Sequence, residues 1–503
     1  MGARMPWSFG NSSKRSRRQL HRVVATVVAV LGSMGTNISA QQIPTFPTLP
    51  PDLVVGQGRS EPCLHDLQGT VLCGRFRVYE NRDTHRGRTI DLAFVVLKAV
   101  TDRGHRDAYT QFNGGPGVGA TSSASSTNSI RTAIREDRDI LLVDHRGTGW
   151  SAPLLCDNPF PRGIPSRFET VFPLDHVDAC REMLSQRADL SQYTTINAMD
   201  DLAELTAWLG YDQLDLSGGS YGTREAQIFA RRHPEMVRTV ILNGVAPVHE
   251  RVYVHHSRDL QGALDNLLAE CKTQADCSSA YPDLESVLRE VLATAMDDPP
   301  TVIVQNTAVS FGIGPLSYAL RGLLYGRSGS VPARLYGAHT GNWQALASYY
   351  LSRQAWVGGS DGTPAGYHFS VLCAEDIDPL TWEEIARETA GTFMGDFLIA
   401  GYKRVCERWP SAKLPESYFA PVHSDKPALL LSGGRDPVTP VSGANTVARD
   451  WPNGLHVVVP NGGHGQGGSC INQMILKLVQ TASVEGIDVT CVRSPPPTRF
   501  ELP

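Results

Sequence analysis

The sequence predicts an α/β fold in which a mostly parallel central sheet is flanked by helices and interrupted by one helical insertion. From about residue 60 to Gly244, apolar runs typical of buried strands alternate with helix-forming stretches. Between residues 247 and 421 the pattern becomes mainly helical, and strand-like runs return at Lys426. With 503 residues, of which 41% are hydrophobic and 19% charged, the chain can bury the large core that this fold needs.

The first 40 residues are predicted to be a secretory signal peptide rather than part of the fold. An apolar run at residues 23–31 follows a basic stretch and precedes Ile38-Ser39-Ala40, which fits a small-residue cleavage site. A membrane anchor is the alternative, but the run is short for a bilayer span. Residues 16–20 also resemble a twin-arginine signal, so the export route stays open. We expect an exported protein, secreted or periplasmic, with no stable membrane insertion after signal removal.

The net charge argues against nucleic-acid and anionic-membrane partners. The signal segment holds six basic and no acidic residues, so its removal changes the formal net charge from −5 to −11. A chain this acidic is not an evident binder of nucleic acid or anionic lipid. We therefore predict no nucleic-acid partner.

Residues 60–246 are predicted to form the first part of the α/β core, after a proline-rich lead-in at residues 41–59. A strand at residues 108–112 ends in Asn113-Gly114-Gly115-Pro116-Gly117, a loop that can present backbone N–H groups to an anion. An ordinary glycine turn is the alternative. A phosphate loop is disfavoured because no Gly-Lys-Ser/Thr follows.

The segment Gly218-Gly219-Ser220-Tyr221-Gly222 is typical of a nucleophile elbow. A short apolar strand precedes it and helix formers follow, so Ser220 would occupy a sharp strand-to-helix turn. The helix would present free N–H groups and its positive dipole end to an oxyanion. In a chain this rich in glycine the pattern arises by chance with a probability of roughly a few tenths. An ordinary Gly/Ser turn therefore remains the alternative until a matching acid and base are found.

Two later strands supply those partners in order. One strand ends in a glycine turn that carries Asp436, and the next is followed by a glycine loop that carries His464. Thr439 and Pro440 are expected to be the N-cap and the first residue of the intervening helix. The order serine, aspartate, histidine is the one that α/β-hydrolases use. The sequence therefore predicts a catalytic triad of Ser220, Asp436 and His464.

The predicted chemistry is acyl transfer through a covalent acyl-enzyme. His464 would take the Ser220 hydroxyl proton during attack and later pass it to the leaving group, while Asp436 fixes the imidazole tautomer. The backbone N–H groups of Gly115 and Tyr221 would form the oxyanion hole, with a neighbouring loop glycine as the alternative to Gly115. This chemistry needs no metal and no cofactor, and we predict neither.

Four segments together carry a family resemblance. They are Asn-Gly-Gly-Pro-Gly at 113–117, Asp-His-Arg-Gly-Thr-Gly-Trp-Ser at 144–151, Gly-Gly-Ser-Tyr-Gly-Thr at 218–223 and Gly-Gly-Arg-Asp-Pro-Val-Thr-Pro at 433–440. From about residue 60 to the end, the chain resembles the proline iminopeptidase family of α/β-hydrolases and, more closely, its secreted tripeptidyl aminopeptidase branch. The resemblance implies the same triad and the 113–117 loop as an oxyanion element. Asn113 and His145 stand where cytosolic members typically carry His and Gln, so strict proline specificity is not implied.

The ten cysteines of an exported chain without any C-x-x-C pair indicate disulfides rather than a zinc ribbon or a thioredoxin-like site. Spacing alone leaves about 945 connectivities open. The resemblance favours pairing of neighbours, because the similar secreted family carries cysteines in comparable places. The expected pairs are Cys63–Cys73, Cys156–Cys180, Cys271–Cys277, Cys373–Cys406 and Cys470–Cys491.

Residues 247–421, here called the cap segment, lie between the predicted nucleophile and the predicted acid in the sequence. We expect them to cover the active site. Residues 422–503 are then expected to complete the core. An aminopeptidase must bind a free N-terminal ammonium, whose desolvation requires a carboxylate nearby. Glu375 and Asp376 are our candidates. The alternative is that Asp376 or Asp378 only helps to start the helix expected at residues 379–390.

These features favour a secreted serine exopeptidase that cleaves peptide bonds near free N-termini, of the prolyl or tripeptidyl aminopeptidase type. Its expected partners are peptide substrates with a free N-terminus. An esterase or another small-acyl hydrolase with the same triad is the alternative, because the fold does not determine the substrate. A non-catalytic binding protein is disfavoured by the complete Ser220, Asp436 and His464 set.

Overall fold

A computed structural model describes residues 44–64, 70–126, 128–156, 163–354, 364–492 and 497–503 of the chain. Residues 1–40, the predicted signal peptide, lie outside this described part. Pro44–Pro503 form one compact unit. Within that unit the boundaries of the cap segment stay a prediction.

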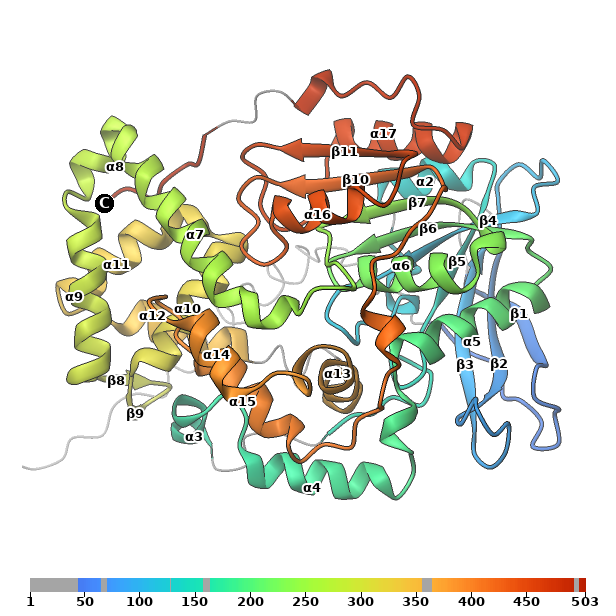
Figure 1. Ribbon diagram of the computed structural model, residues 1–503, viewed down its shortest axis with the longest axis horizontal. Helices are drawn as coiled ribbons and strands as arrows, with labels where there is room; N and C mark the ends of the chain where they lie inside the picture. The colour runs from blue at the N-terminus through green and yellow to red at the C-terminus, as the bar shows by residue number, and fades with distance from the viewer. Residues whose placement is uncertain (1–43, 65–69, 127, 157–162, 355–363, 493–496) are drawn as a thin grey trace, which may run out of the picture. The chain divides into compact units, whose positions relative to one another are not determined.

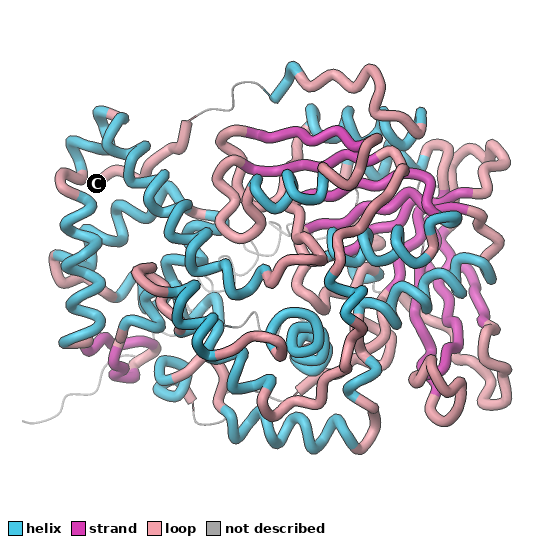
Figure 2. Tube along the Cα trace, viewed as in Figure 1, coloured by secondary structure: helices cyan, strands magenta, loops and turns pink. Residues whose placement is uncertain are grey.

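A nine-stranded sheet lies at the centre of this unit (Figures 1 and 2). Its spatial order is β1-β2-β3-β5-β4-β6-β7-β10-β11. The pairs β1/β2, β2/β3 and β3/β5 are antiparallel, and every pair from β5/β4 to β10/β11 is parallel. This mostly parallel sheet, flanked by helices, confirms the predicted α/β-hydrolase fold. The strands of the sheet are β1 Gly58–Leu64, β2 Val71–Tyr79, β3 Thr89–Leu97, β4 Asp107–Phe112, β5 Asp139–Val143, β6 Gln213–Gly219, β7 Val237–Asn243, β10 Ala428–Gly433 and β11 Gly454–Val459.

Helices cover both faces of the sheet (Figure 1). Strand β5 shows why, because successive side chains of a strand point to opposite faces. Ile140 and Leu142 pack in one buried cluster with α2 and α17, whereas Leu141 and Val143 pack in the other with α5, α6 and α16. A strand buried on both faces is apolar throughout, which is the pattern that the sequence shows. The helices outside the cap segment are α2 Ser129–Arg135, α3 Ile164–Glu169, α4 Leu174–Ser185, α5 Thr195–Trp208, α6 Gly222–Arg232, α16 Val441–Ala448 and α17 Ser469–Thr481.

The cap segment is mainly helical, as predicted, and also contains a small antiparallel hairpin that the sequence reasoning missed. Strands β8 Thr301–Val304 and β9 Thr307–Ser310 pair around Gln305 and Asn306, both with positive φ, which closes a two-residue turn. In the described residues no helix is both long and apolar enough to span a membrane. The cap helices are α7 Val252–Thr273, α8 Ala275–Ala280, α9 Leu284–Asp297, α10 Ile313–Gly326, α11 Val331–His339, α12 Gln344–Gln354, α13 Ala365–Leu372, α14 Trp382–Thr389 and α15 Phe397–Cys406.

All ten cysteines form disulfides between sequence neighbours, which leaves no free cysteine among the described residues. The pairs are Cys63–Cys73, Cys156–Cys180, Cys271–Cys277, Cys373–Cys406 and Cys470–Cys491. The fourth pair joins the end of α15 to a π-helical turn, Cys373–Ile377, that follows α13. That turn carries the two carboxylates proposed to meet the substrate ammonium.

Removing the Cys373–Cys406 disulfide is expected to destabilise the protein more than removing Cys271–Cys277. The two pairs close loops with sequence separations of 33 and 6 residues. In the chain-entropy model these loops contribute about 4 and about 2 kcal/mol to the free energy of unfolding. Urea unfolding of the double alanine variants C373A/C406A and C271A/C277A measures the difference. Equal losses for the two variants would show that loop length does not set the contribution here.

Candidate active site

Ser220 occupies the turn between β6 and α6 in a strained backbone conformation. Its φ angle is +56°, in the left-handed region that non-glycine residues rarely adopt. The Ser220 N–H donates to the Asn243 carbonyl at 2.9 Å. Its own carbonyl accepts from both the N–H and the hydroxyl of Thr223, at 2.9 and 2.6 Å. These bonds hold the nucleophile elbow in the conformation that lifts the hydroxyl off the strand.

The two flanking glycines of the elbow are sterically required. A Cβ on Gly218 would lie 2.3 Å from the carbonyl oxygen of Gly222. A Cβ on Gly222 would lie 2.3 Å from the carbonyl oxygen of Phe112, at the end of β4. Backbone therefore approaches backbone too closely for any side chain at either position, which is why the motif needs glycine at both.

Asp436 and His464 come together from the loops that follow β10 and β11. The Asp436 carboxylate is buried and accepts hydrogen bonds from the N–H groups of Val438 and Thr439, at 3.0 and 2.9 Å. His464 Nδ1 lies 2.9 Å from Oδ2 and 3.0 Å from Oδ1 of the same carboxylate. The structure thus holds the predicted acid against the predicted base.

Thr439 has a role that the sequence reasoning missed. Its hydroxyl donates to Asp436 Oδ2 at 2.6 Å and lies 3.1 Å from His464 Nδ1. The expectation that Thr439 is a helix N-cap is wrong, because α16 begins at Val441 and Pro440 is its N-cap residue. The Asp-x-x-Thr spacing is the signal that could have indicated this contact.

Ser220 and His464 line one cavity of about 750 Å³, here called the catalytic cavity. Within the described residues no hydrogen bond joins their side chains. Catalytic hydrogen bonds are often long before substrate binds and tighten in the complex. The cap segment contributes Tyr253, Arg321 and Tyr325 to the same cavity.

The 113–117 loop passes directly beside Ser220. A Cβ on Gly114 would lie 3.1 Å from Ser220 Cβ and 3.5 Å from its Oγ. The Gly115 carbonyl accepts a hydrogen bond from Tyr253 at 3.2 Å, so a cap helix holds this loop. In the described part of the chain no acceptor takes the N–H of Tyr221. Tyr221, Gly114 and Gly115 therefore remain the candidate oxyanion donors.

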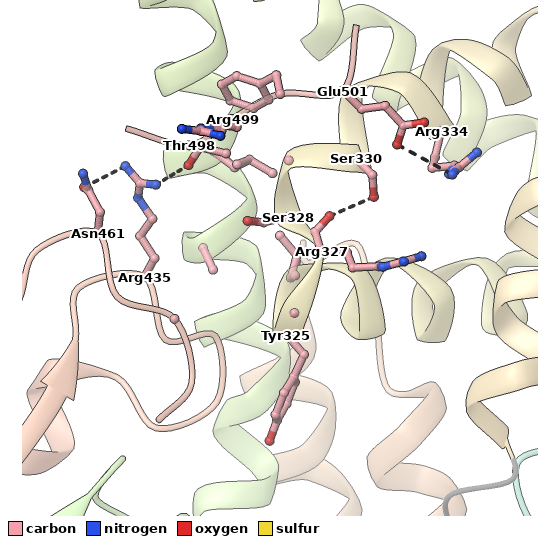
Figure 3. Close-up of a pocket in the computed structure, with 17 residues that line it drawn as sticks. Tyr325, Arg327, Ser328, Ser330, Arg334, Arg435, Asn461, Thr498, Arg499 and Glu501 are labelled. Carbon is pink, nitrogen blue, oxygen red and sulfur yellow. Dashed lines mark hydrogen bonds and ion pairs between the residues drawn. The ribbon is translucent and has the colours of Figure 1, made fainter. Parts of the chain in front are cut away.

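Tyr325 forms a wall between the catalytic cavity and a second one. Its ring packs against the His464 ring with centroids 4.7 Å apart. Tyr325 also lines a neighbouring cavity of about 790 Å³, which several arginine side chains line as well. Figure 3 shows Tyr325 at one end of that cavity, with its hydroxyl directed away from these arginines. Two of those arginines are paired: Arg435 with Glu270 at 2.9 Å and Arg334 with Glu501 at 3.7 Å.

Glu375 is not placed where it could meet a substrate. Its buried carboxylate accepts from the N–H and hydroxyl of Thr195, both at 2.8 Å, and from the Tyr418 hydroxyl at 2.5 Å. Burial raises the pKa of Glu375, against the opposing effect of these hydrogen bonds. Because these contacts occupy the carboxylate and it does not line the catalytic cavity, Glu375 is corrected from a substrate ligand to an internal structural group.

Asp376, the next residue, does line the catalytic cavity. Its Oδ2 pairs with the guanidinium of Arg224, which also donates to the carbonyls of Pro247 and Glu250 at 3.0 and 2.9 Å. Its Oδ1 is buried and has no hydrogen-bond partner among the described residues. This oxygen therefore keeps an unused capacity to accept a hydrogen bond.

The alternative role in helix capping is wrong for both Asp376 and Asp378. Helix α14 starts at Trp382, and Thr381 is its N-cap, with a capping box completed by Glu384. The Thr381 hydroxyl accepts from the Glu384 N–H at 3.1 Å. The helix start is thus satisfied locally, several residues beyond the two aspartates.

Comparison with known proteins shows what this chain is similar to. A family model of the α/β-hydrolase fold matches residues 112–304, and one described as TAP-like protein matches residues 391–491. Serine protease Hip1 of Mycobacterium tuberculosis is 24% identical over 462 residues, covering 81% of this chain and 85% of that protein. Tripeptidyl aminopeptidase of Streptomyces lividans is 23% identical over 471 residues, covering 86% of each. The crystal structure of proline iminopeptidase from Mycobacterium smegmatis aligns at 15% identity with a TM-score of 0.35, over 78% of this chain and 95% of that one.

Proposed function

We propose that this chain, a serine hydrolase of the α/β-hydrolase fold, is an exported exopeptidase that releases residues or short peptides from free N-termini. The observation that carries the proposal is that Ser220, His464 and Asp376 line one cavity, with Asp436 bonded behind His464. The relatives named serine protease and tripeptidyl aminopeptidase support the peptide bond as the bond cleaved.

The proposed reaction follows from the positions of the triad. Ser220 Oγ attacks the scissile carbonyl carbon while His464 Nε2 takes the hydroxyl proton. Asp436 accepts the Nδ1 proton of His464 in a hydrogen bond and so stabilises the imidazolium that forms. His464 then protonates the leaving amine, and water hydrolyses the acyl-enzyme by the reverse sequence.

The oxyanion of the tetrahedral intermediate would accept hydrogen bonds from Tyr221 N–H and from the 113–117 loop. Tyr221 is the N-cap residue of α6, so its N–H lies at the positive end of that helix. The proximity of Gly114 to Ser220 supports a second donor from the loop, at Gly114 or Gly115.

Selection of free N-termini is proposed to depend on Asp376. An ammonium group can donate to the unpartnered Oδ1 without displacing Arg224 from Oδ2. An acylated amine carries no charge and offers one donor at most, so it would leave this buried oxygen without a charged partner.

Export is supported by the disulfides. Five disulfides in one chain are typical of an oxidising compartment. The signal peptide itself, at residues 1–40, remains the prediction made from the sequence.

Substrates with free and acetylated amines test the proposal. We expect acetylation of a tripeptidyl chromogenic amide to lower kcat/KM by at least about 100-fold, since a lost charged contact costs roughly 3 kcal/mol. Asp376→Asn should reduce this ratio below about 10-fold, because Asn offers an ammonium no charge. Asp378→Asn is the matched control, since Asp378 is exposed and lies outside the catalytic cavity. Proline and alanine amides and an aryl ester complete the substrate set.

Each result has one consequence. Equal cleavage of free and acetylated peptides would show that the enzyme is not an aminopeptidase. Hydrolysis of the aryl ester without any amide cleavage would replace the proposal with an esterase. A ratio that persists in Asp376→Asn would remove only the assignment of Asp376.

A further inference from the structure

Arg321, in α10, is a cation of the catalytic cavity without a hydrogen-bond or ion-pair partner among the described residues. It lines the same cavity as Ser220 and His464, and its side chain is only partly buried there. Among the described residues it makes no hydrogen bond and no ion pair, and its Nε is buried without an acceptor. Its guanidinium lies only over aromatic rings, 5.6 Å from the centroid of Tyr318 and 5.3 Å from that of Tyr325.

The arginines that are fully buried among the described residues are all bonded. Arg146 pairs with Asp201 at 2.7 Å, and Arg77 pairs with Asp91 at 2.7 Å. Arg135 donates to the Lys98 carbonyl at 2.9 Å. The remaining members of this buried group, Arg131, Arg138 and Arg224, also have carbonyl, amide or carboxylate partners. A desolvated cation without an anion is costly, so Arg321 is poised for a ligand that supplies one.

The groups around Arg321 do not supply that negative charge. Burial raises the pKa of Tyr325 to about 12 and that of Tyr253 well above its usual value, so both hydroxyls are neutral. Burial, with Arg321 as a further cause, lowers the pKa of His256 well below its usual value and that of His368 to about 4, so both rings are also neutral.

The charged side chains that line the cavity are Arg224, Arg321 and Asp376, which leaves one positive charge in excess. A substrate ammonium at Asp376 would add another positive charge. A substrate that also carries a carboxylate would offset one of these positive charges.

We propose that Arg321 binds a carboxylate of the substrate, so that the enzyme prefers peptides that bring an anionic group into the cavity together with their free N-terminus. The proposal rests on the function proposed above for the same cavity. Arginine can grip a carboxylate through two parallel N–H bonds, which gives orientation as well as affinity. Tyr325 contacts both Arg321 and the His464 ring, so the two lie on the same side of the cavity near the reacting groups. The carboxylate would therefore belong to a residue close to the scissile bond.

Two kinds of substrate distinguish the source of the carboxylate. The first arm uses free-amine tripeptidyl p-nitroanilides with Glu or Gln at each of the three positions. The second arm uses tetrapeptides with a free C-terminal carboxylate or a C-terminal amide. We expect the wild-type enzyme to prefer the acid by about 10-fold to 100-fold in kcat/KM in one arm, as for a charged hydrogen bond. The arm that shows the preference identifies a side chain or a C-terminus as the source.

Variants of Arg321 connect the preference to this residue. Arg321→Gln should reduce the acid-to-amide ratio to below about 3-fold, and Arg321→Lys should retain part of it, because a lysine keeps the charge but not the paired donors. Arg327→Gln is the matched control, because Arg327 is an exposed arginine at the end of the same helix and does not line the catalytic cavity. The control should keep the wild-type ratio. Thermal unfolding of each variant checks the fold.

A binding measurement keeps this test independent of peptidase activity. Calorimetry with the Ser220→Ala variant should show tighter binding of the Glu peptide, or of the free-acid peptide, than of its amide. The difference should vanish in Ser220→Ala/Arg321→Gln. If free-amine peptides are cleaved and bound without any preference for acids, or if the preference survives Arg321→Gln, the role of Arg321 is refuted and the proposed function stands. If no peptide is cleaved, the proposed function fails, and calorimetry alone decides on Arg321.

Discussion

Replacing Ser220 with alanine is expected to reduce kcat/KM for a peptide amide by about 10⁴-fold to 10⁶-fold, as losses of a serine nucleophile do in triad enzymes. In the proposed mechanism the hydroxyl oxygen forms the acyl-enzyme, and alanine has no atom that can replace it. Steady-state kinetics of the purified variant measure the loss. An organophosphonate should label the wild-type protein at Ser220 and should not label the variant.

The fold should survive this substitution. Alanine has no larger side chain than serine, and the three hydrogen bonds that hold the elbow come from the backbone of residue 220, which alanine retains. Ser352→Ala, at an exposed serine of α12, is the control and should keep full activity. Substantial turnover by Ser220→Ala with an unchanged thermal unfolding curve would show that another residue is the nucleophile.

The elbow and the two loop positions were predictable because their signals are local. A serine between glycines at the end of an apolar strand, and glycine turns after two later strands, each indicate their own loop. Because parallel strands end at the same edge of a sheet, the strand pattern also predicts that these loops meet. The contact between Asp436 and His464 follows from β10 and β11 being adjacent in the sheet.

The choice between Glu375 and Asp376 was not predictable from the sequence. Adjacent residues of a helix point in different directions, and here the turn is π-helical, which changes the direction of each side chain relative to an α-helix. One carboxylate therefore turns inward to Thr195 and Tyr418, while the other reaches the cavity. Only the rotation of this turn decides which carboxylate is available.

Arg321 was missed for a different reason. Its sequence environment in α10 is apolar and aromatic, which is typical of a helix that packs into a core. What distinguishes Arg321 from the bonded arginines is the lack of a partner among the described residues. Such a property belongs to the space around a side chain and leaves no mark in the order of residues.

Asp436→Asn is expected to lower kcat by about 10³-fold to 10⁴-fold while leaving the fold intact, as the loss of a triad carboxylate does. The asparagine oxygen can still accept the N–H groups of Val438 and Thr439. Its amide nitrogen then faces His464 Nδ1 and donates to it. This forces the imidazole proton onto Nε2, the nitrogen that must accept the Ser220 proton, so the base is held in the wrong tautomer.

A second aspartate–histidine pair of the same chain provides the control for this prediction. Asp450 lies 3.0 Å from His423 Nδ1, close to the spacing in the catalytic pair, but the His423 side chain is 76% exposed. Asp450→Asn removes a comparable contact in water, where an ion pair contributes about 1 kcal/mol or less, so kcat should change by less than about 2-fold. If Asp436→Asn instead kept a tenth or more of the wild-type kcat, Asp436 would not be orienting the base. In that case Thr439, the other group within reach of His464 Nδ1, would have to hold the tautomer alone, and Thr439→Val would show the larger loss.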